Sequence, residues 1–194
     1  TVPPSKTAMT PPTLPVLIVA DGALQENPIE EGAKLRIPKL PEVAAPQGDS
    51  GAVAETARML VNAQHPVLIA DRYARTQEGN VRLVELAELL QCADIDTSAR
   101  LNMPSRHPLN QSGRARGQVR AADIVLGLEM NDYWASLNAY RDQLHRSSES
   151  LQRTNSKTVH LGSGDLYIKS NYQDFQRFAD VDLAFEHAQT PFVR

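Results

Sequence analysis

The chain has 194 residues, of which 41% are hydrophobic and 22% charged, and its formal net charge is −3. This length is sufficient to bury a core, and this composition is ordinary for a globular protein. The acidic balance excludes the electrostatic attraction expected of a nucleic-acid or membrane-surface partner, and no apolar run approaches the roughly 20 residues that span a bilayer.

Residues 1–48 differ in composition from the rest of the chain. They hold nine of the 13 prolines around one strand-like run, Pro15-Val-Leu-Ile-Val-Ala20, which Asp21-Gly22 closes. A single strand cannot satisfy its own backbone groups, so this run needs a sheet to join. The first residue, Thr1, is not an initiator methionine, and we expect a fragment of a longer protein. Residues 30–47, with three spaced prolines, are typical of an extended linker.

From Asp49 onward, segments with helical periodicity alternate with short apolar runs. Asp49 or Ser50 can cap a helix that ends before His65, with Val53, Ala57, Leu60 and Val61 on one face. The expected elements that follow are a strand at Pro66–Ala70, a loop over 71–80, a helix at 81–90, a strand at 93–97, a strand at Ile124–Leu128, a helix at 133–145, a polar stretch over 146–156, a strand at 158–161 and a last strand at 181–185.

The strands at 93–97 and 124–128 are joined by a long polar connection that contains two prolines. Such a connection favours parallel strands with a crossover, because a hairpin needs only a few residues. We therefore predict an α/β fold: a three-layer α/β/α, doubly wound, mostly parallel sheet of five or six strands, Rossmann-like, with these two strands in its middle. The predicted domains are a tail with its linker at 1–48 and the Rossmann-like domain at 49–194.

Five segments together resemble the central domain of thiamine-diphosphate-dependent enzymes of the acetolactate synthase and benzoylformate decarboxylase group. They are Asn62-Ala-Gln-His-Pro-Val-Leu-Ile-Ala70, Leu83-Val-Glu-Leu-Ala-Glu-Leu-Leu90, Asn102-Met-Pro-Ser-Arg-His-Pro-Leu109, Ala122-Asp-Ile-Val-Leu-Gly-Leu128 and Lys157-Thr-Val-His-Leu161. Their order and spacing match that family over about residues 14–185. The resemblance implies that residues 1–48 are the tail of an upstream pyrimidine-binding domain.

The resemblance also places the catalytic residues of such an enzyme outside this chain. In that family a glutamate of the pyrimidine-binding domain activates thiamine diphosphate, and a Gly-Asp-Gly segment with a downstream asparagine in the pyrophosphate-binding domain holds Mg²⁺ and the diphosphate. The pairs Asp21-Gly22, Gly48-Asp49 and Gly164-Asp165 lack that asparagine and are predicted to be turns. We therefore expect a catalytically silent chain without catalytic or metal-binding residues. Thiamine diphosphate and Mg²⁺ are expected in the parent, a lyase or transferase and homo-oligomer whose missing domains are its partners.

Some relatives hold FAD or ADP in this domain, on a glycine-rich turn after the first strand. Here that turn, Asp71-Arg-Tyr-Ala-Arg-Thr76, contains no glycine, which argues against FAD because side chains obstruct close backbone approach. Arg72, Arg75 and Arg100 follow predicted strands and could bind an ADP or CoA phosphate through their side chains. Alternatively, these arginines are solvated or form salt bridges to neighbouring domains.

The remaining polar candidates favour structural roles. His107 is expected to fix its loop by a hydrogen bond, and the other histidines lack metal-ligand spacing. Residues 114–120 form a basic cluster that is predicted to be a helix face in contact with another domain. Trp134 is predicted to lie in the core or at an interface. Cys92, the single cysteine, is expected to be a buried apolar residue, and its isolation favours a reducing compartment, by default the cytoplasm.

Two functional hypotheses therefore remain open. The first is the central structural domain of a thiamine-diphosphate-dependent enzyme that acts on 2-oxo acids or related acyl substrates. The alternative is a free-standing nucleotide-binding module for ADP or CoA, or an assembly module, without thiamine chemistry. The coding sequence on either side of this chain distinguishes the two.

Overall fold

The computed structural model describes residues 4, 8, 15–29, 31–32, 34, 48–97, 101–142, 147–168 and 177–185. The chain divides into two compact units, Thr1–Ala45 and Pro46–Arg194.

In the first unit, the strand-like run Pro15–Ala20 has no regular secondary structure. Its apolar side chains are exposed, with Leu17 at 89% and Val19 at 86%. Such a run forms a strand only when it pairs with a sheet, because an isolated strand leaves its backbone N–H and C=O groups unpaired. Asp21 does not form a simple turn either; its side chain accepts a hydrogen bond from the Ala23 N–H and caps a short helix, α2 (Gly22–Glu26).

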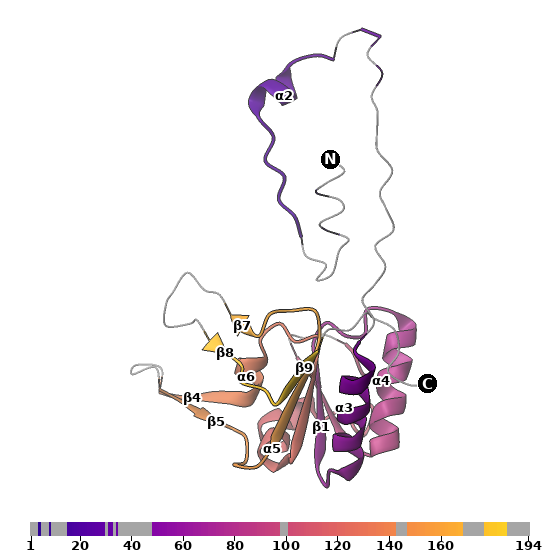
Figure 1. Cartoon of the computed structure of the whole chain (residues 1–194), viewed down its shortest axis with the longest axis vertical. Coiled ribbons are helices and arrows are strands. Elements are labelled where there is room, and N and C mark those ends of the chain that lie inside the picture. The colour runs from indigo at the N-terminus through magenta and orange to yellow at the C-terminus, as the bar shows by residue number, and fades with distance from the viewer. Residues whose placement is uncertain are drawn as a thin grey trace. The chain divides into compact units, whose positions relative to one another are not determined.

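The second unit contains a parallel sheet of five strands with helices on both faces, as predicted (Figure 1). The strands are β1 (Pro66–Ala70), β2 (Ala93–Asp96), β3 (Ile124–Leu128), β6 (Lys157–Leu161) and β9 (Leu183–Phe185). Their spatial order is β2-β1-β3-β6-β9, and every neighbouring pair is parallel. The second unit is therefore a three-layer, doubly wound α/β/α domain.

Successive side chains of each strand point to opposite faces of the sheet and pack into two separate hydrophobic cores, as the two-residue period of a strand requires. On one face, Leu68, Leu126 and Leu161 pack beneath α3 (Ser50–Asn62) and α4 (Gln77–Leu90). On the other face, Val67 and Val125 pack beneath α5 (Ala115–Ala121) and α6 (Tyr133–Leu137). Burial on both faces explains why β1 and β3 are continuous apolar runs in the sequence.

The two helices of the first face differ in detail from the prediction. Asp49 caps α3, but Thr56 and Leu60 are its buried residues, whereas Val61 is 74% exposed, so the predicted apolar face is rotated. Helix α4 begins at Gln77, four residues before its predicted start, because the Thr76 hydroxyl accepts a hydrogen bond from the Gly79 N–H and caps the first turn.

Strand β2 lies at the edge of the sheet and not in its middle, because β1 separates it from β3. The following loop covers part of this edge. Asn110 forms an isolated parallel bridge with Asp94, and the Asp94 N–H donates to the Leu109 carbonyl at 2.8 Å. The long connection is therefore a crossover, as predicted, but it passes over β1 to reach β3.

The predicted helix at 133–145 is wrong beyond its first turns. Helix α6 ends at Leu137, and an antiparallel hairpin follows, formed by β4 (Asn138–Asp142) and β5 (Ser147–Ser150). Asn138 has extended backbone, and its side-chain amide donates to the Trp134 carbonyl, which terminates the helix. Leu137, Ala139 and Leu151 are buried against the sheet, so tertiary packing favours the hairpin over a longer helix.

A second small hairpin, β7 (Tyr167–Ile168) with β8 (Arg177–Phe178), was not anticipated from the sequence. The guanidinium of Arg177, the first residue of β8, lies 5.3 Å from the centre of the half-buried Trp134 ring.

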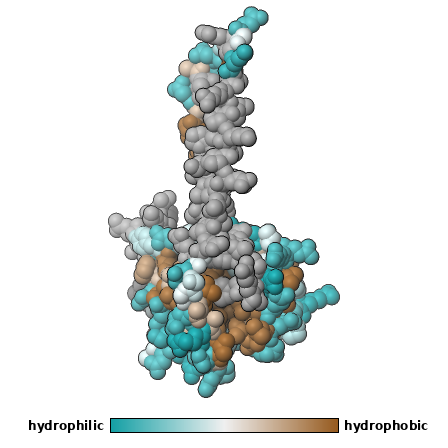
Figure 2. Space-filling model, turned by 45° about the vertical axis from the view of Figure 1, so that its right-hand side comes forward, coloured by the Kyte–Doolittle hydropathy of each residue, from teal (hydrophilic) through white to brown (hydrophobic). Residues whose placement is uncertain are grey.

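Figure 2 shows hydrophobic side chains among hydrophilic ones on one face of the molecule. In the described part of the chain, none of the helices has the length and apolar character needed to cross a membrane.

Candidate functional site

The strand order reverses between β1 and β3, which creates a topological switch point. From β1 the chain runs outward to β2, then returns past β1 to β3 and continues to β6 and β9. In open α/β sheets, ligands bind outside the carboxyl ends of the strands at such a point. The residues that follow β1, β3 and β6 are therefore the candidate site.

The turn after β1 is held from beneath by Asn102, which is 3% exposed. Its side-chain amide donates to the Asp71 carbonyl at 2.8 Å, and its side-chain oxygen accepts from the Ala74 N–H at 2.8 Å. The Asn80 side chain donates in turn to the Asn102 carbonyl. These bonds fix the shape of a turn that contains no glycine.

The backbone N–H groups of this turn are directed into the chain itself. Asp71 N–H donates to the Leu128 carbonyl, Arg72 N–H to the Glu129 carbonyl and Arg75 N–H to the Tyr73 carbonyl. The Ala74 N–H is used by Asn102. Backbone donors that are already used at these four positions cannot bind a pyrophosphate, so an anion at this turn would depend on side chains.

Glu129, the first residue after β3, carries its carboxylate into the candidate site. Glu129 is 3% exposed and has a left-handed backbone with φ of 50°. Its Oε2 atom lies 3.6 Å from Arg75 Nη2 and accepts a hydrogen bond from the Ser163 hydroxyl at 3.3 Å. Burial raises the pKa of Glu129, while the charges of Arg75 and Arg72 and the bonds from Ser163 oppose that rise.

Of the three arginines proposed from the sequence, the structure brings Arg72 and Arg75 together at the carboxyl end of β1, whereas Arg100 lies outside the described residues. Arg75 Nε donates to the Arg72 carbonyl at 2.7 Å. An Arg72 guanidinium nitrogen lies 3.8 Å from the position that a Cβ on Gly164 would occupy. We call Arg72, Arg75, Glu129 and Ser163 the switch-point cluster.

Glu129 and Ser163 were not identified from the sequence. Each is the first or second residue after an apolar run that was correctly predicted to be a strand. Parallel strands end at one edge of a sheet, so a search for polar residues at these positions would have found both. The contact between them depends on the pairing of β3 with β6, which spacing alone does not reveal.

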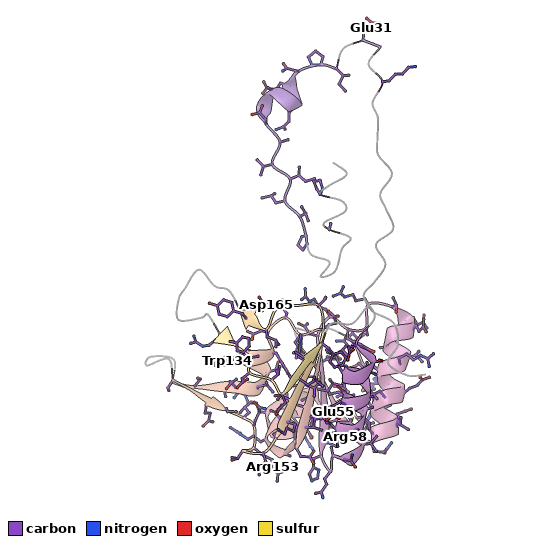
Figure 3. The ribbon with its side chains drawn as sticks, in the orientation of Figure 1. Glu31, Glu55, Arg58, Trp134, Arg153 and Asp165 are labelled. Atoms are coloured by element: carbon purple, nitrogen blue, oxygen red, sulfur yellow. The ribbon has the colours of Figure 1, made fainter. Side chains whose placement is uncertain are left out.

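Two polar cavities lie at the opposite edge of the sheet. One has a volume of about 400 Å³ and is lined by Gln64, Asp123, Arg153, Thr154, Asn155 and Ser156. The other, of about 430 Å³, shares Arg153, Thr154 and Ser156 with it. Figure 3 shows Arg153 at this edge and Asp165, which follows β6, at the carboxyl edge.

Asp123, which lines the first of these cavities, has a structural role. Its carboxylate accepts hydrogen bonds from the Gln64 and His65 N–H groups. Burial raises the pKa of Asp123, but these bonds outweigh that effect and lower it.

The other candidates of the sequence have structural roles where the structure describes them. His107 Nε2 lies 3.1 Å from a Glu88 carboxylate oxygen, and its Nδ1 accepts from the Leu109 N–H, so its predicted loop-fixing role is confirmed. Cys92 is buried, as predicted, and burial raises the pKa of its thiol to about 12. Arg120 of the basic cluster contacts Glu149 of β5 at 3.2 Å. Among the described residues, no three His, Cys, Asp or Glu side chains form a group suited to a metal ion.

Comparison with known proteins supports the fold. No family model matches the sequence, and no curated protein does. The structure is similar to that of a Mycobacterium smegmatis protein described as a thiamin diphosphate-dependent enzyme, with a TM-score of 0.55, 15% identity, and coverage of 81% of this chain and 29% of that chain. It is also similar to benzoylformate decarboxylase from Polynucleobacter necessarius, with a TM-score of 0.55, 14% identity and coverage of 82% and 29%. The chain thus spans less than a third of the length of either structure.

Proposed function

We propose that this chain is the central structural domain of a thiamine-diphosphate-dependent enzyme, a lyase or transferase that acts on 2-oxo acids or related acyl substrates. The observation that carries the proposal is the likeness of fold to two such enzymes, which extends over about four fifths of this chain and 29% of theirs. The five segments that resemble this family lie on β1, α4, the loop beside β2, β3 and β6, which together form most of the sheet and one of its helical faces.

In this proposal the catalytic groups come from other domains of the parent protein. Residues 1–48 would be the tail of a pyrimidine-binding domain, and residues 49–194 the central domain. The family resemblance assigns the resident cofactor and its Mg²⁺ to these other domains, so both would be bound elsewhere in the parent. Exposed apolar side chains support contacts with such domains or with further subunits: Val61 is 74% exposed, Leu89 76% and Leu101 72%.

We expect the isolated chain to bind thiamine diphosphate with Mg²⁺ at least a hundredfold more weakly than the parent protein does. The physical reason is that the diphosphate and Mg²⁺ need an oxygen-rich site, which the flanking domains would supply. Calorimetric titration of the chain and of the longer coding product, each with the cofactor, checks this. Micromolar binding by the isolated chain would contradict the proposal. A parent without a thiamine-dependent reaction on 2-oxo acids would contradict the assigned activity.

A second candidate function is an ADP- or CoA-binding module, favoured by the position of Arg72 and Arg75 at the switch point. Because the backbone donors of Asp71, Arg72, Ala74 and Arg75 are used, the turn does not favour FAD held through backbone contacts. We expect no thermal stabilisation of the wild-type chain by FAD, ADP or CoA at 20 mM or 200 mM salt. A salt-sensitive shift with ADP or CoA that disappears when both arginines are replaced by alanine would establish the second candidate instead.

A further inference from the structure

The switch-point cluster already contains an anion that belongs to the chain. The Glu129 carboxylate lies 3.6 Å from the Arg75 guanidinium and accepts a hydrogen bond from the hydroxyl of Ser163, a residue that lies between Gly162 and Gly164. Guanidinium groups, hydroxyls and the N–H groups of glycine-rich turns are also the usual partners of a phosphate group. The carboxylate therefore occupies the position where this fold would place an anionic ligand.

We propose that Glu129 is a built-in substitute for a phosphate group, and that removing its charge converts this chain into a binder of diphosphate-bearing ligands. The inference concerns the switch-point cluster alone and does not depend on whether the parent protein uses thiamine diphosphate.

Glu129 has a left-handed backbone conformation, with φ of 50°, which non-glycine residues rarely adopt. The conformation is held by the Glu129 N–H, which donates to the Leu161 carbonyl at 2.7 Å, and by the Glu129 carbonyl, which accepts from the Arg72 N–H. Both bonds use backbone atoms, so they persist when the side chain is changed.

Arg72 supplies the second positive charge and has donor capacity in reserve. Its Nε atom is buried and lacks a hydrogen-bond partner among the described residues. Its charge acts on Glu129, and its guanidinium approaches the turn after β6 at Gly164. Without the Glu129 carboxylate, the Arg75 guanidinium and the Ser163 hydroxyl would lose the anion they contact, and the charge of Arg72 would remain nearby. Asp71 is the nearby negative charge, and one of its oxygens accepts from the Asn131 N–H.

The test uses two variants that remove the carboxylate in different ways. Glu129→Gln keeps the shape of the side chain, and Glu129→Gly also suits the left-handed backbone, so we expect it to fold. Glu149→Gln is the matched control, because it removes one negative charge from an exposed pair with Arg120. The probe is inorganic pyrophosphate, measured by isothermal titration at 20 mM and 200 mM salt, with ADP as a second probe.

We expect both Glu129 variants to bind pyrophosphate at least tenfold more tightly than the wild type and the Glu149→Gln control, with weaker binding at high salt. Adding Arg72→Ala to Glu129→Gly is expected to abolish the gain. Tighter binding of ADP than of pyrophosphate would show that the gained site also recognises the nucleoside. Equal affinities in the wild type and the Glu129 variants, or no binding by any of them, would overturn the proposal. Loss of folding in both variants would overturn it too, since Glu129 would then be required for structure.

Discussion

Replacing Asp94 by asparagine is expected to stabilise the protein by about 1–3 kcal/mol at pH 7, which is the free energy of holding a proton on Asp94 less the cost of burying the unpaired asparagine amide. Asp94 of β2 is fully buried, and neither carboxylate oxygen has a hydrogen-bond partner among the described residues. Burial, with a smaller contribution from the charge of Asp96, raises its pKa from 3.8 to about 8. The folded protein must therefore hold a proton on Asp94 at neutral pH, which the unfolded chain releases.

The sign of the effect follows from this raised pKa. The contribution of Asp94 to stability is fully present below pH 3.8 and is lost progressively as the pH rises to about 8. Asparagine is neutral at every pH and nearly the same shape, so Asp94→Asn removes the dependence. Asp180→Asn, at an exposed position, is the control and should change the free energy of unfolding by less than about 0.5 kcal/mol.

Chemical denaturation between pH 4 and pH 8.5 gives the free energy of unfolding at each pH and so tests this prediction. His160 also contributes to the pH dependence of that free energy below pH 6.5. His160 is buried beside Tyr133, and burial lowers its pKa to about 4, so its contribution is present above pH 6.5 and is lost as the pH falls to 4. In the wild type the contributions of Asp94 and His160 oppose each other between pH 4 and 6.5, and the Asp94 contribution continues to fall up to about pH 8. In Asp94→Asn, the fall in stability between pH 6.5 and pH 8 should be absent. A variant that is less stable than the wild type at pH 7 would contradict the prediction.

Replacing Gly127 by alanine is expected to destabilise the protein by about 3 kcal/mol, at the upper end of the usual range for overpacking a core. Gly127 lies in the central strand β3, beneath the fully buried ring of Tyr133. A Cβ atom at this position would lie 2.7 Å from Tyr133 Cε2 and 2.9 Å from Met130 Cγ. The ring cannot move away easily, because the Tyr133 hydroxyl lies 3.0 Å from the Val125 carbonyl oxygen and 3.1 Å from that of Val159.

Gly117→Ala is the matched control for this substitution. Gly117 lies in α5, and a Cβ there would meet nothing within 4 Å, so alanine should stabilise the helix by about 0.5–1 kcal/mol. The same chemical change is thus expected to have opposite signs at the two positions in urea denaturation. In a Tyr133→Leu background, which lacks the clashing ring atoms, Gly127→Ala should cost less than it does alone. Additive effects of the two substitutions would show that the ring is not the cause.

Local sequence patterns determined the fold class and most of the sheet. The continuous apolar runs at Pro66–Ala70 and Ile124–Leu128 predicted buried parallel strands, and Asp49 predicted the start of α3, because these signals act within one strand or one helical turn. The same locality explains the errors. The apolar spacing after Tyr133 is compatible with a helix, but the buried side chains of Ala139 and Leu151 stabilise a hairpin through contacts distant in sequence. Pro15–Ala20 has strand composition without a strand partner in the described part of its unit.

The candidate site was determined only by tertiary structure. Arg72 and Arg75 were identified from their place after a strand, but the contact of Arg75 with Glu129, and of Glu129 with Ser163, requires that β1, β3 and β6 be neighbours in parallel register. Likewise, nothing in the sequence distinguishes Asp94 from an exposed aspartate; its raised pKa arises because the sheet and the loop beside β2 remove it from water. Periodicity and capping depend on residues a few positions apart, whereas the charge that a carboxylate meets, and the water it loses, depend on which strands pair.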